Sequence, residues 1–433
     1  MAALSGNEMN SSGIPVPENW KFRFFTIWTG QAFSMFGTSI VSFALIWWLT
    51  ESTGSPSVLA AATLFTILPA IALGPFVGTL VDKFKRKNVL LVANTVVALL
   101  TLSLIALFYF DITTPWQIIM IIFFRETGLT FKSTAMSAST TLMVPESQLS
   151  RIGGVNQTLS GVLRIVGAPA GALLITLFPV HIVLMVDIIT AALAVMSLVI
   201  ITIPQPPQNI GDESTEQDQP SFFRETREGL QFVLAWKALF WVVMTCTFAN
   251  VFGGPTRSFQ PLMVTQIFGG GALELSYISI AAGTGLILGG LLMSAWKGFK
   301  RRLITSAVGW IGIGVAFTAA SLTPSDMYPM FLAMIFIVGI MTPVGCAPLD
   351  AFYQSCVPAA KQGRVFGVLA CIDGLTMPFG LIIAWLVGHM VPLRAWYLLY
   401  GLSHAILGLI WLGIPFIRKA EDEARQRREM GTL

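Results

Sequence analysis

Runs of about twenty apolar residues recur along the whole chain, and each is long enough to cross a hydrocarbon core of about 30 Å. Hydrophobic residues make up 55% of the 433 residues and charged residues only 11%, with a mean hydropathy of +0.74. A soluble protein carries roughly 25% charged residues. The apolar runs are continuous rather than alternating, which disfavours a β-barrel. The sequence therefore predicts an all-α polytopic membrane protein.

Twelve membrane-spanning helices are predicted, in two groups of six. The longest loop, 204–236, separates an N-terminal half at 23–203 from a C-terminal half at 237–416, and 1–22 and 417–433 form the two tails. The predicted spans are 23–49, 57–81, 88–110, 115–142, 153–178, 180–203, 237–265, 273–296, 302–322, 327–354, 363–389 and 393–416.

The distribution of cations predicts the orientation of these helices. Most of the 26 Lys and Arg residues lie in the loops that share a side with both termini, whereas the opposite loops hold only Arg394. Loops rich in Lys and Arg stay in the cytoplasm. We therefore expect both termini to be cytoplasmic. The first twenty residues contain no apolar core, so no cleaved signal peptide is expected.

The loop at 204–236 has two parts of different composition. Its first part, "PQPPQNIGDESTEQDQ", is rich in Pro and acidic residues and is predicted to be flexible. Its second part, "SFFRETREGLQFVLAW", begins with a serine cap and places Phe222, Phe223, Leu230, Val233 and Leu234 at roughly helical spacing. This second part is predicted to form an amphipathic helix on the inner leaflet.

The two halves resemble each other at an offset of 213 residues. "VPESQLSRIGG" at 144–154 aligns with "VPAAKQGRVFG" at 357–367, and the charged stretch at 78–87 aligns near "GLLMSAWKGFKRR" at 290–302. A parallel repeat of six helices is typical of one class of secondary transporter, whose binding site lies near the bilayer midplane. A purely structural duplication would also give a repeat, but the agreement with the topology and the central linker favours a transporter.

The stretch "GTLVDKFKRK" at 78–87 resembles the motif between spans 2 and 3 of the major facilitator superfamily, G-x-L-x-D-x-x-x-R-[KR]. Its positions are filled by Gly78, Leu80, Asp82, Arg86 and Lys87. The resemblance implies a gating motif made of Gly78, Asp82, Arg86 and Lys87. In it, Asp82 bonds a helix start or a nearby Arg in one conformation. Ser294 stands at the matching acidic position of the second half, which implies a latch on one side only.

Three other stretches resemble the macrolide-efflux and siderophore-export branch of the drug:proton antiporters. They are "FRETREGLQFV", "LMVPESQLSRIGGVNQ" and "GRVFG…MPFGL". The resemblance implies a transporter of the bacterial inner (plasma) membrane that exports amphipathic, macrolide-like drugs by proton antiport with alternating access. Export of a siderophore or lysolipid stays an alternative, as does, in a different class, a non-transporting membrane sensor or enzyme.

The partners expected from this resemblance are a small amphipathic substrate, protons and the lipid bilayer. No nucleic acid is expected, and the chain is expected to act as a monomer. The sequence contains no nucleotide-binding phosphate loop, no HExxH and no GxSxG. Its four cysteines show no CxxC spacing and are expected to be reduced packing residues. We therefore expect no enzyme activity, no cofactor and no bound metal.

Eight ionisable residues lie inside the predicted spans. They are Arg125, Glu126, Lys132, Arg164, Asp187, Arg257, Asp350 and Asp373. A lone charge at the centre of a membrane helix costs about 2.5–3.5 kcal/mol. Because four cations face four anions, these side chains are expected to face a polar cavity or one another.

Proton coupling requires a carboxylate whose charge changes with conformation. The candidates are Arg125, Glu126, Asp187 and Asp373. Arg125 in "FFRETG" resembles the span-4 arginine motif that the family links with proton transfer. The alternative for each candidate is a buried ion pair that fixes the position of a helix.

The candidates for a substrate cavity are Gln31, Phe33, Phe36, Arg164 and Arg257. The two phenylalanines could equally pack against a neighbouring helix. The stretch "GVLRIVGAPAGALL" resembles the Gly-Pro-Gly signature of antiporters and so points towards export. Its members Gly167 and Gly171 form a face on which a neighbouring helix can approach closely, and Pro169 loosens the backbone. Ordinary helix packing explains this spacing equally well.

Overall fold

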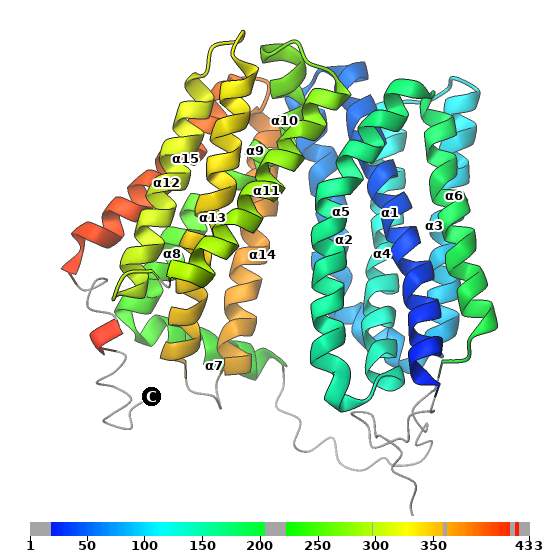
Figure 1. The fold of residues 1–433 in the computed structure, drawn as a ribbon, viewed down its shortest axis with the longest axis horizontal. Coiled ribbons are helices and arrows are strands. Elements are labelled where there is room, and N and C mark those ends of the chain that lie inside the picture. The colour runs from blue at the N-terminus through cyan, green and yellow to red at the C-terminus, as the bar shows by residue number, and fades with distance from the viewer. Residues whose placement is uncertain (1–18, 204–221, 297, 358–361, 416–420, 424–433) are drawn as a thin grey trace, which may run out of the picture. The chain divides into compact units, whose positions relative to one another are not determined.

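The computed structural model of the chain describes residues 19–203, 222–296, 298–357, 362–415 and 421–423, without the side chains of residues 75, 82 and 222–226. Most of both predicted tails and the first part of the predicted linker therefore lie outside the described residues. The described backbone is helical and contains no strand (Figure 1). This confirms the predicted all-α fold class.

Contacts between Cα atoms divide the chain into two compact units, residues 1–54 with 61–212 and residues 55–60 with 213–433. The long helices of the first unit are α1 (Trp20–Thr53), α2 (Pro56–Lys83, of which residues 61–83 belong to this unit), α3 (Arg86–Tyr109), α4 (Pro115–Met143), α5 (Leu149–Leu177) and α6 (Val180–Ile200). A short 3₁₀ helix, Glu146–Gln148, precedes α5.

The second unit begins with shorter pieces and continues with five long helices. Its pieces are α7 (Phe222–Ala235), α8 (Lys237–Asn250), α9 (Gly253–Ser258), α10 (Gln260–Leu262) and a π-helical turn (Met263–Ile267). Its long helices are α11 (Ala272–Trp296), α12 (Arg302–Leu322), α13 (Tyr328–Cys356), α14 (Gln362–Val387) and α15 (Leu393–Gly413).

Among the described residues, 11 helical segments are long and apolar enough to cross a membrane. The predicted fourth span, α4, is not one of them although its 29 residues extend over about 43 Å. Its polarity is the reason, because it carries Arg125, Glu126 and Lys132. With α4 added, the count agrees with the twelve predicted spans. The buried charges of α4 therefore need partners inside the protein.

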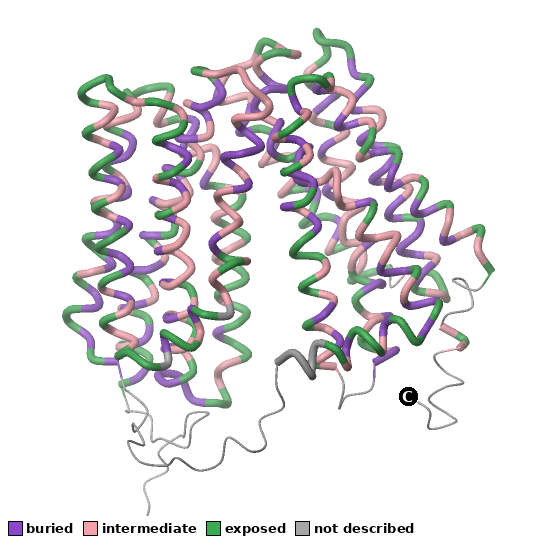
Figure 2. Tube along the Cα trace, turned by 180° about the vertical axis from the view of Figure 1, so that it is seen from behind, coloured by how far each residue is buried: buried purple, intermediate pink, exposed green. Residues whose placement is uncertain are grey.

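In the first unit, α1 packs against α5 and α6, while α3 packs against α4 and α6. Small residues let these helices approach closely. A Cβ atom at Gly30 of α1 would lie 2.5 Å from the hydroxyl oxygen of Ser197 on α6, and one at Gly37 would meet the hydroxyl of Thr190. Buried and exposed positions alternate around each long helix (Figure 2). Apolar side chains such as Leu99 are left on the outer faces, as a lipid environment requires.

In the second unit, α12 packs against α13 and α15, and α13 packs against α11. Glycines again set these distances. Gly309 of α12 lies against the backbone of Gly345 on α13, and Gly314 of α12 against the backbone of Ala405 on α15. Close backbone approach at small residues is the usual way in which membrane helices associate.

The predicted seventh span, 237–265, is confirmed as an apolar segment over Lys237–Ser258, but its helix is interrupted. The chain turns at Val251 and Phe252, between α8 and α9. Pro255 explains the break, because it has no N–H to donate to the carbonyl of Val251 and its ring crowds that carbonyl. The carbonyl oxygen of Val251 lies where a Cβ atom of Gly380 would be. Glycine at 380 therefore lets α14 pack directly against the break.

A helix is present where the second part of the linker predicts one. This helix, α7, packs against α14, and a Cβ atom at Gly229 would lie 2.5 Å from the carbonyl oxygen of Arg364. Arg364 forms an ion pair with Glu228, with 2.6 Å between Nη1 of the arginine and Oε2 of the glutamate. Leu230 and Leu234 are exposed on α7. One face of this helix thus contacts protein, and the exposed leucines are available for the predicted membrane contact.

Candidate functional site

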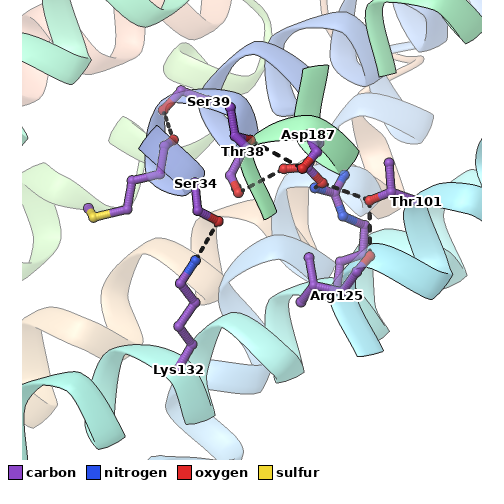
Figure 3. A network of polar contacts seen from close by, with 10 residues as sticks. Ser34, Thr38, Ser39, Thr101, Arg125, Lys132 and Asp187 are labelled. Carbon is purple, nitrogen blue, oxygen red and sulfur yellow. Dashed lines mark hydrogen bonds and ion pairs between the residues drawn. The ribbon is translucent and has the colours of Figure 1, made fainter. Parts of the chain in front are cut away.

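A buried ion pair lies at the centre of the first unit (Figure 3). Nη2 of Arg125 on α4 lies 2.9 Å from Oδ2 of Asp187 on α6, and the two side chains are only 4% and 1% exposed. Thr101 of α3 donates a 2.7 Å hydrogen bond to the same carboxylate, and Thr38 of α1 donates one of 3.3 Å. Asp187 therefore connects α6 to α1, α3 and α4.

Glycines beside the ion pair allow the helices that carry it to approach closely. Gly37 of α1 lies against the Cα atom of Asp187, at 3.2 Å from the position that a Cβ would take. A larger residue at 37 would push α1 away from the carboxylate. Gly128, one turn after Arg125 on α4, faces Val97 of α3 in the same way. Small residues beside the charges therefore allow four helices to meet around one carboxylate.

A second buried cation lies on the same helix. Lys132 of α4 is 6% exposed, and its Nζ donates a 2.7 Å hydrogen bond to the hydroxyl of Ser34 on α1. Gln31 lies three residues before Ser34 and is 4% exposed, and neither its amide oxygen nor its amide nitrogen has a hydrogen-bond partner among the described residues. Gln31, a predicted cavity residue, is thus buried one helical turn before the serine that binds the Lys132 ammonium group.

Glu126 follows Arg125 on α4 and points about 100° away from it around the helix. Its side chain is half-buried, and it forms no ion pair with any described residue. Glu126 therefore differs from Asp187, which has three hydrogen-bonding partners. The two carboxylates predicted as proton carriers in this unit have unlike surroundings.

The glycines of α5 contact α1. A Cβ atom at Gly167 would lie 2.9 Å from Cβ of Ser39, and one at Gly171 would lie 3.0 Å from Cβ of Phe43. The contacts Gly167–Ser39 and Gly171–Phe43 are therefore separated by one turn along each helix. Pro169 lies between the two glycines inside α5. The face of α5 that carries Gly167 and Gly171 is thus in close contact with a neighbouring helix, α1, as the spacing of the two glycines predicts.

Two cations of the predicted gating motif bind helix ends. Nη1 of Arg86 donates a 2.7 Å hydrogen bond to the carbonyl of Ala138 near the end of α4. Nζ of Lys87 donates to the carbonyls of Val199 and Ile201 at the end of α6, at 3.1 and 3.0 Å. Cations are favourable at helix C-termini. Gly78 has open space where a Cβ would be, and the side chain of Asp82 lies outside the described residues.

The second unit repeats the arginine contact. Nη1 of Arg302, at the start of α12, donates a 2.8 Å hydrogen bond to the carbonyl of Ala351 on α13. Ala351 follows Ala138 by 213 residues, which is the offset of the internal repeat. In both units, therefore, an arginine at the start of a long helix, Arg86 of α3 and Arg302 of α12, donates to a backbone carbonyl of the next long helix.

The remaining predicted cavity residues are described within their own units. Phe33 is 51% exposed and lines a shallow groove between α1 and α6, whereas Phe36 packs against an apolar cluster around Ile40. Arg164 on α5 and Arg257 on α9 are exposed on their own units and form no ion pair with any described residue.

A cavity of about 400 Å³ lies inside the second unit. Asp350 of α13 and Asp373 of α14 line it, together with residues of α8 and with Trp310 of α12. Neither carboxylate forms an ion pair or hydrogen bond with a described residue. Of these residues, only Asp373 was predicted as a functional site.

The described residues contain no cluster of three or more His, Cys, Asp or Glu side chains that could hold a metal ion. The described cysteines are free thiols, and Cys246 and Cys346 line the cavity.

Two units of long apolar helices, with paired charges inside one and an acidic cavity inside the other, define a polytopic membrane protein of the transporter class. The chain belongs to the Major Facilitator Superfamily, whose family model matches residues 27–381. This confirms the family resemblance found in "GTLVDKFKRK". Membership of this family makes the chain a transporter rather than an enzyme.

Macrolide efflux protein A from Streptococcus pyogenes is 31% identical to this chain over 405 residues, which are 93% of this chain and 98% of that protein. The protein of the same name from Enterococcus faecalis is 29% identical over 330 residues, covering 76% of this chain and all of that protein. The crystal structure of the nucleoside transporter NupG matches with a TM-score of 0.62 at 15% identity, covering 91% of this chain and 98% of that one. That structural likeness shows the fold.

Proposed function

We propose that this transporter exports amphipathic, macrolide-like drugs from a bacterial cell by proton antiport. The observation that carries the proposal is the similarity to proteins named macrolide efflux protein A, which extends over 93% of this chain. The protein would lie in the inner (plasma) membrane as a monomer, with both termini cytoplasmic, as the positive loops predict. Transport would follow alternating access of the six-helix halves at 23–203 and 237–416, joined by the cytoplasmic linker.

We assign the coupling protons to Glu126 and Asp373. Burial favours the neutral form of a carboxylate and a nearby cation favours its charged form, so a change of surroundings changes its proton occupancy. Neither of these carboxylates has a fixed cationic partner among the described residues. Asp187 has Arg125 within 2.9 Å and two threonine donors. Arg125 and Asp187 therefore hold the four helices around Glu126 in this proposal.

The remaining predicted residues take supporting roles. Gly78, Asp82, Arg86 and Lys87 form the gate, in which Arg86 and Lys87 are anchored to the ends of α4 and α6. Gly167 and Gly171 carry no side chains where α5 contacts α1, and Pro169 lies between them inside α5. In this proposal, the three residues allow α5 to move along α1. Arg164 and Arg257 are exposed cations on membrane-spanning helices, and such groups face a water-filled path.

Everted membrane vesicles test the proposal. An imposed proton gradient, acidic inside the vesicle, should drive uptake of a radiolabelled macrolide, and collapse of the gradient by an ionophore should stop it. Vesicles that hold Glu126→Gln or Asp373→Asn protein should lose the dependence of uptake on the gradient. Asp326→Asn is the matched control, because Asp326 is an exposed acid between α12 and α13. Uptake that is equal with and without the gradient in wild-type vesicles would overturn proton antiport.

A further inference from the structure

Two acidic residues of the C-terminal tail bind the start of α12. Oε1 of Glu421 accepts a 2.7 Å hydrogen bond from the backbone N–H of Leu303, the second residue of that helix. Oδ2 of Asp422 lies 2.9 Å from Nη2 of Arg301, the residue before α12. Both contacts lie within the second unit. The tail and the start of α12, which are 118 residues apart in sequence, are therefore in direct contact.

The contact made by Glu421 replaces a helix cap. Arg301 stands at the N-cap position of α12 but its side chain makes no capping hydrogen bond, and the first turn of the helix contains no acidic residue. A capping side chain normally accepts from the second or third N–H of a helix, and Leu303 provides the second. A carboxylate there also interacts favourably with the positive end of the helix dipole. The cap of α12 thus comes from the tail.

A third acidic residue extends the contact to the corner between α7 and α8. Oε2 of Glu423 accepts a 3.2 Å hydrogen bond from Nε1 of Trp236, which is only 2% exposed. The ring of Trp236 lies 6.1 Å from the ring of Phe352 on α13. The segment Glu421–Glu423 is the separate red piece near the C-terminus in Figure 1. We call this segment the acidic clasp, because it joins α12 to the corner between α7 and α8.

The clasp binds the residues on both sides of Arg302. Nη1 of Arg302 donates a 2.8 Å hydrogen bond to the carbonyl of Ala351 on α13. Its neighbours Arg301 and Leu303 are the two residues that the tail carboxylates bind. Because both neighbours are anchored, the backbone from which Arg302 reaches α13 is anchored as well.

The tail carboxylates also make the contacts that the gating motif assigns to its own acid. In the first unit that acid is Asp82, which is expected to bond a helix start or a nearby arginine. Ser294 stands at the matching position of the second half, and its hydroxyl bonds the carbonyl of Gly290 in its own helix. In the second unit, Glu421 bonds a helix start and Asp422 bonds an arginine.

We propose that the acidic clasp supplies the second unit with the acids that its loop between α11 and α12 lacks, and that it positions Arg302 on α13. The clasp stays closed while the protein changes conformation, so it affects the rate of transport and not the affinity for substrate. The Arg301 and Asp422 side chains are 37% and 50% exposed, and salt screens exposed charges. The clasp therefore loosens as the ionic strength rises. This inference goes beyond the proposed function and holds for any substrate.

Hydrogen exchange of the purified full-length protein in detergent tests the clasp without transport. The neutral clasp variant, Glu421→Gln/Asp422→Asn, should exchange the amide hydrogens in the first turn of α12 at least about tenfold faster than wild-type protein, because hydrogen bonds to charged groups are strong. Asp326→Asn, which removes an exposed acid elsewhere in the second unit, should leave this exchange unchanged. Wild-type exchange at this turn in the neutral clasp variant would overturn the clasp.

The dependence on salt separates a charged clasp from an ordinary packing contact. Between about 0.1 M and about 1 M salt the Debye length falls from about 10 Å to about 3 Å. Exchange in the first turn of α12 should therefore become faster in wild-type protein over this range. It should change much less in the neutral clasp variant, which has no carboxylates to screen. An equal response to salt in the two proteins would contradict the electrostatic clasp.

A cap placed inside the loop should rescue the neutral clasp variant. Aspartate is a favoured N-cap residue, so Arg301→Asp provides α12 with a carboxylate at its own start. Added to the neutral clasp variant, Arg301→Asp should restore slow exchange in the first turn, whereas Arg301→Ala in the same background should not. Equal exchange in these two triple variants would contradict the capping role of Glu421.

Transport measurements distinguish positioning from damage to the fold. At equal amounts of protein, the neutral clasp variant should take up a labelled macrolide into everted vesicles a few-fold more slowly, while its equilibrium affinity for the macrolide stays at the wild-type value. A wild-type rate, or an equal loss of affinity, would overturn the positioning role. If wild-type vesicles take up no macrolide, the proposed function fails, and the exchange experiments still decide whether the clasp exists.

Discussion

At the scale of single residues, Asp187 is the group on which most helices of the first unit depend. Its carboxylate is bonded by Arg125, Thr101 and Thr38, which come from three other helices. A fully buried ion pair is not by itself a large source of stability, but removal of one member leaves an uncompensated charge. The contribution of Asp187 is therefore best measured by comparing single and double variants.

We expect Asp187→Asn to lower the free energy of unfolding by about 3–5 kcal/mol, because Arg125 stays buried without its counterion. The double variant Arg125→Leu/Asp187→Leu should recover most of this loss. The measurement is the thermal unfolding midpoint of the purified protein in detergent, with Asp326→Asn as the control for a lost surface charge. A wild-type midpoint in the Asp187→Asn variant would show that the pair does not hold these helices together.

The sequence reveals which residues carry buried charge but not how they pair. Arg125 and Asp187 are both identifiable as ionisable groups inside apolar runs, yet they are 62 residues apart. Their contact depends on the rotation of α4 and α6 about their axes, which is set by packing at positions such as Gly37 and Gly128. The orphaned amide of Gln31 and the indole of Trp310 also emerge only when the neighbouring helices are placed.

At the scale of helices, the seventh predicted span shows what a hydropathy pattern leaves out, because the span is present but its helix is interrupted. The stretch is apolar throughout, so it predicts one helix, but the sequence "GGP" at 253–255 contains the signals that interrupt it. The effect of Pro255 is local and could have been predicted. The packing of Gly380 against the freed carbonyl of Val251 could not, because it joins α14 to a break more than a hundred residues earlier.

The contact between α14 and this break predicts opposite outcomes for two glycines of one helix. Gly380→Ala should destabilise the protein by about 1–3 kcal/mol, because the new methyl group overlaps the carbonyl of Val251 and the backbone has to shift. Gly374→Ala is the matched control, since no atom lies within 4 Å of its Cβ position, and alanine there should stabilise the helix by up to about 1 kcal/mol. Thermal unfolding of both variants checks this, and equal midpoints would contradict the close contact.

At the scale of the whole chain, the internal repeat accounts for matched parts of the two units. The arginine contacts at Ala138 and Ala351 are both present, at 2.7 and 2.8 Å. The sequence repeat predicted this correspondence in outline, because a duplicated segment keeps its local helix-end contacts. The functional groups are not matched, however, since the buried ion pair belongs to one unit and the acidic cavity to the other. The two units therefore share helix contacts but differ in where their acidic side chains lie.

The same divergence separates Asp82 from Ser294, and it predicts a one-sided effect on transport. Asp82→Asn should leave the amount of protein in the membrane unchanged but lower the rate of macrolide uptake by at least about fivefold, as expected for loss of a contact that favours one conformation. Ser294→Ala should transport at the wild-type rate, because among the described residues its hydroxyl bonds only the carbonyl of Gly290, within its own helix. Uptake into everted vesicles, normalised to the amount of transporter, measures both variants. Full activity of Asp82→Asn would remove this residue from the gate, and an equal loss in Ser294→Ala would mean that the latch has two sides.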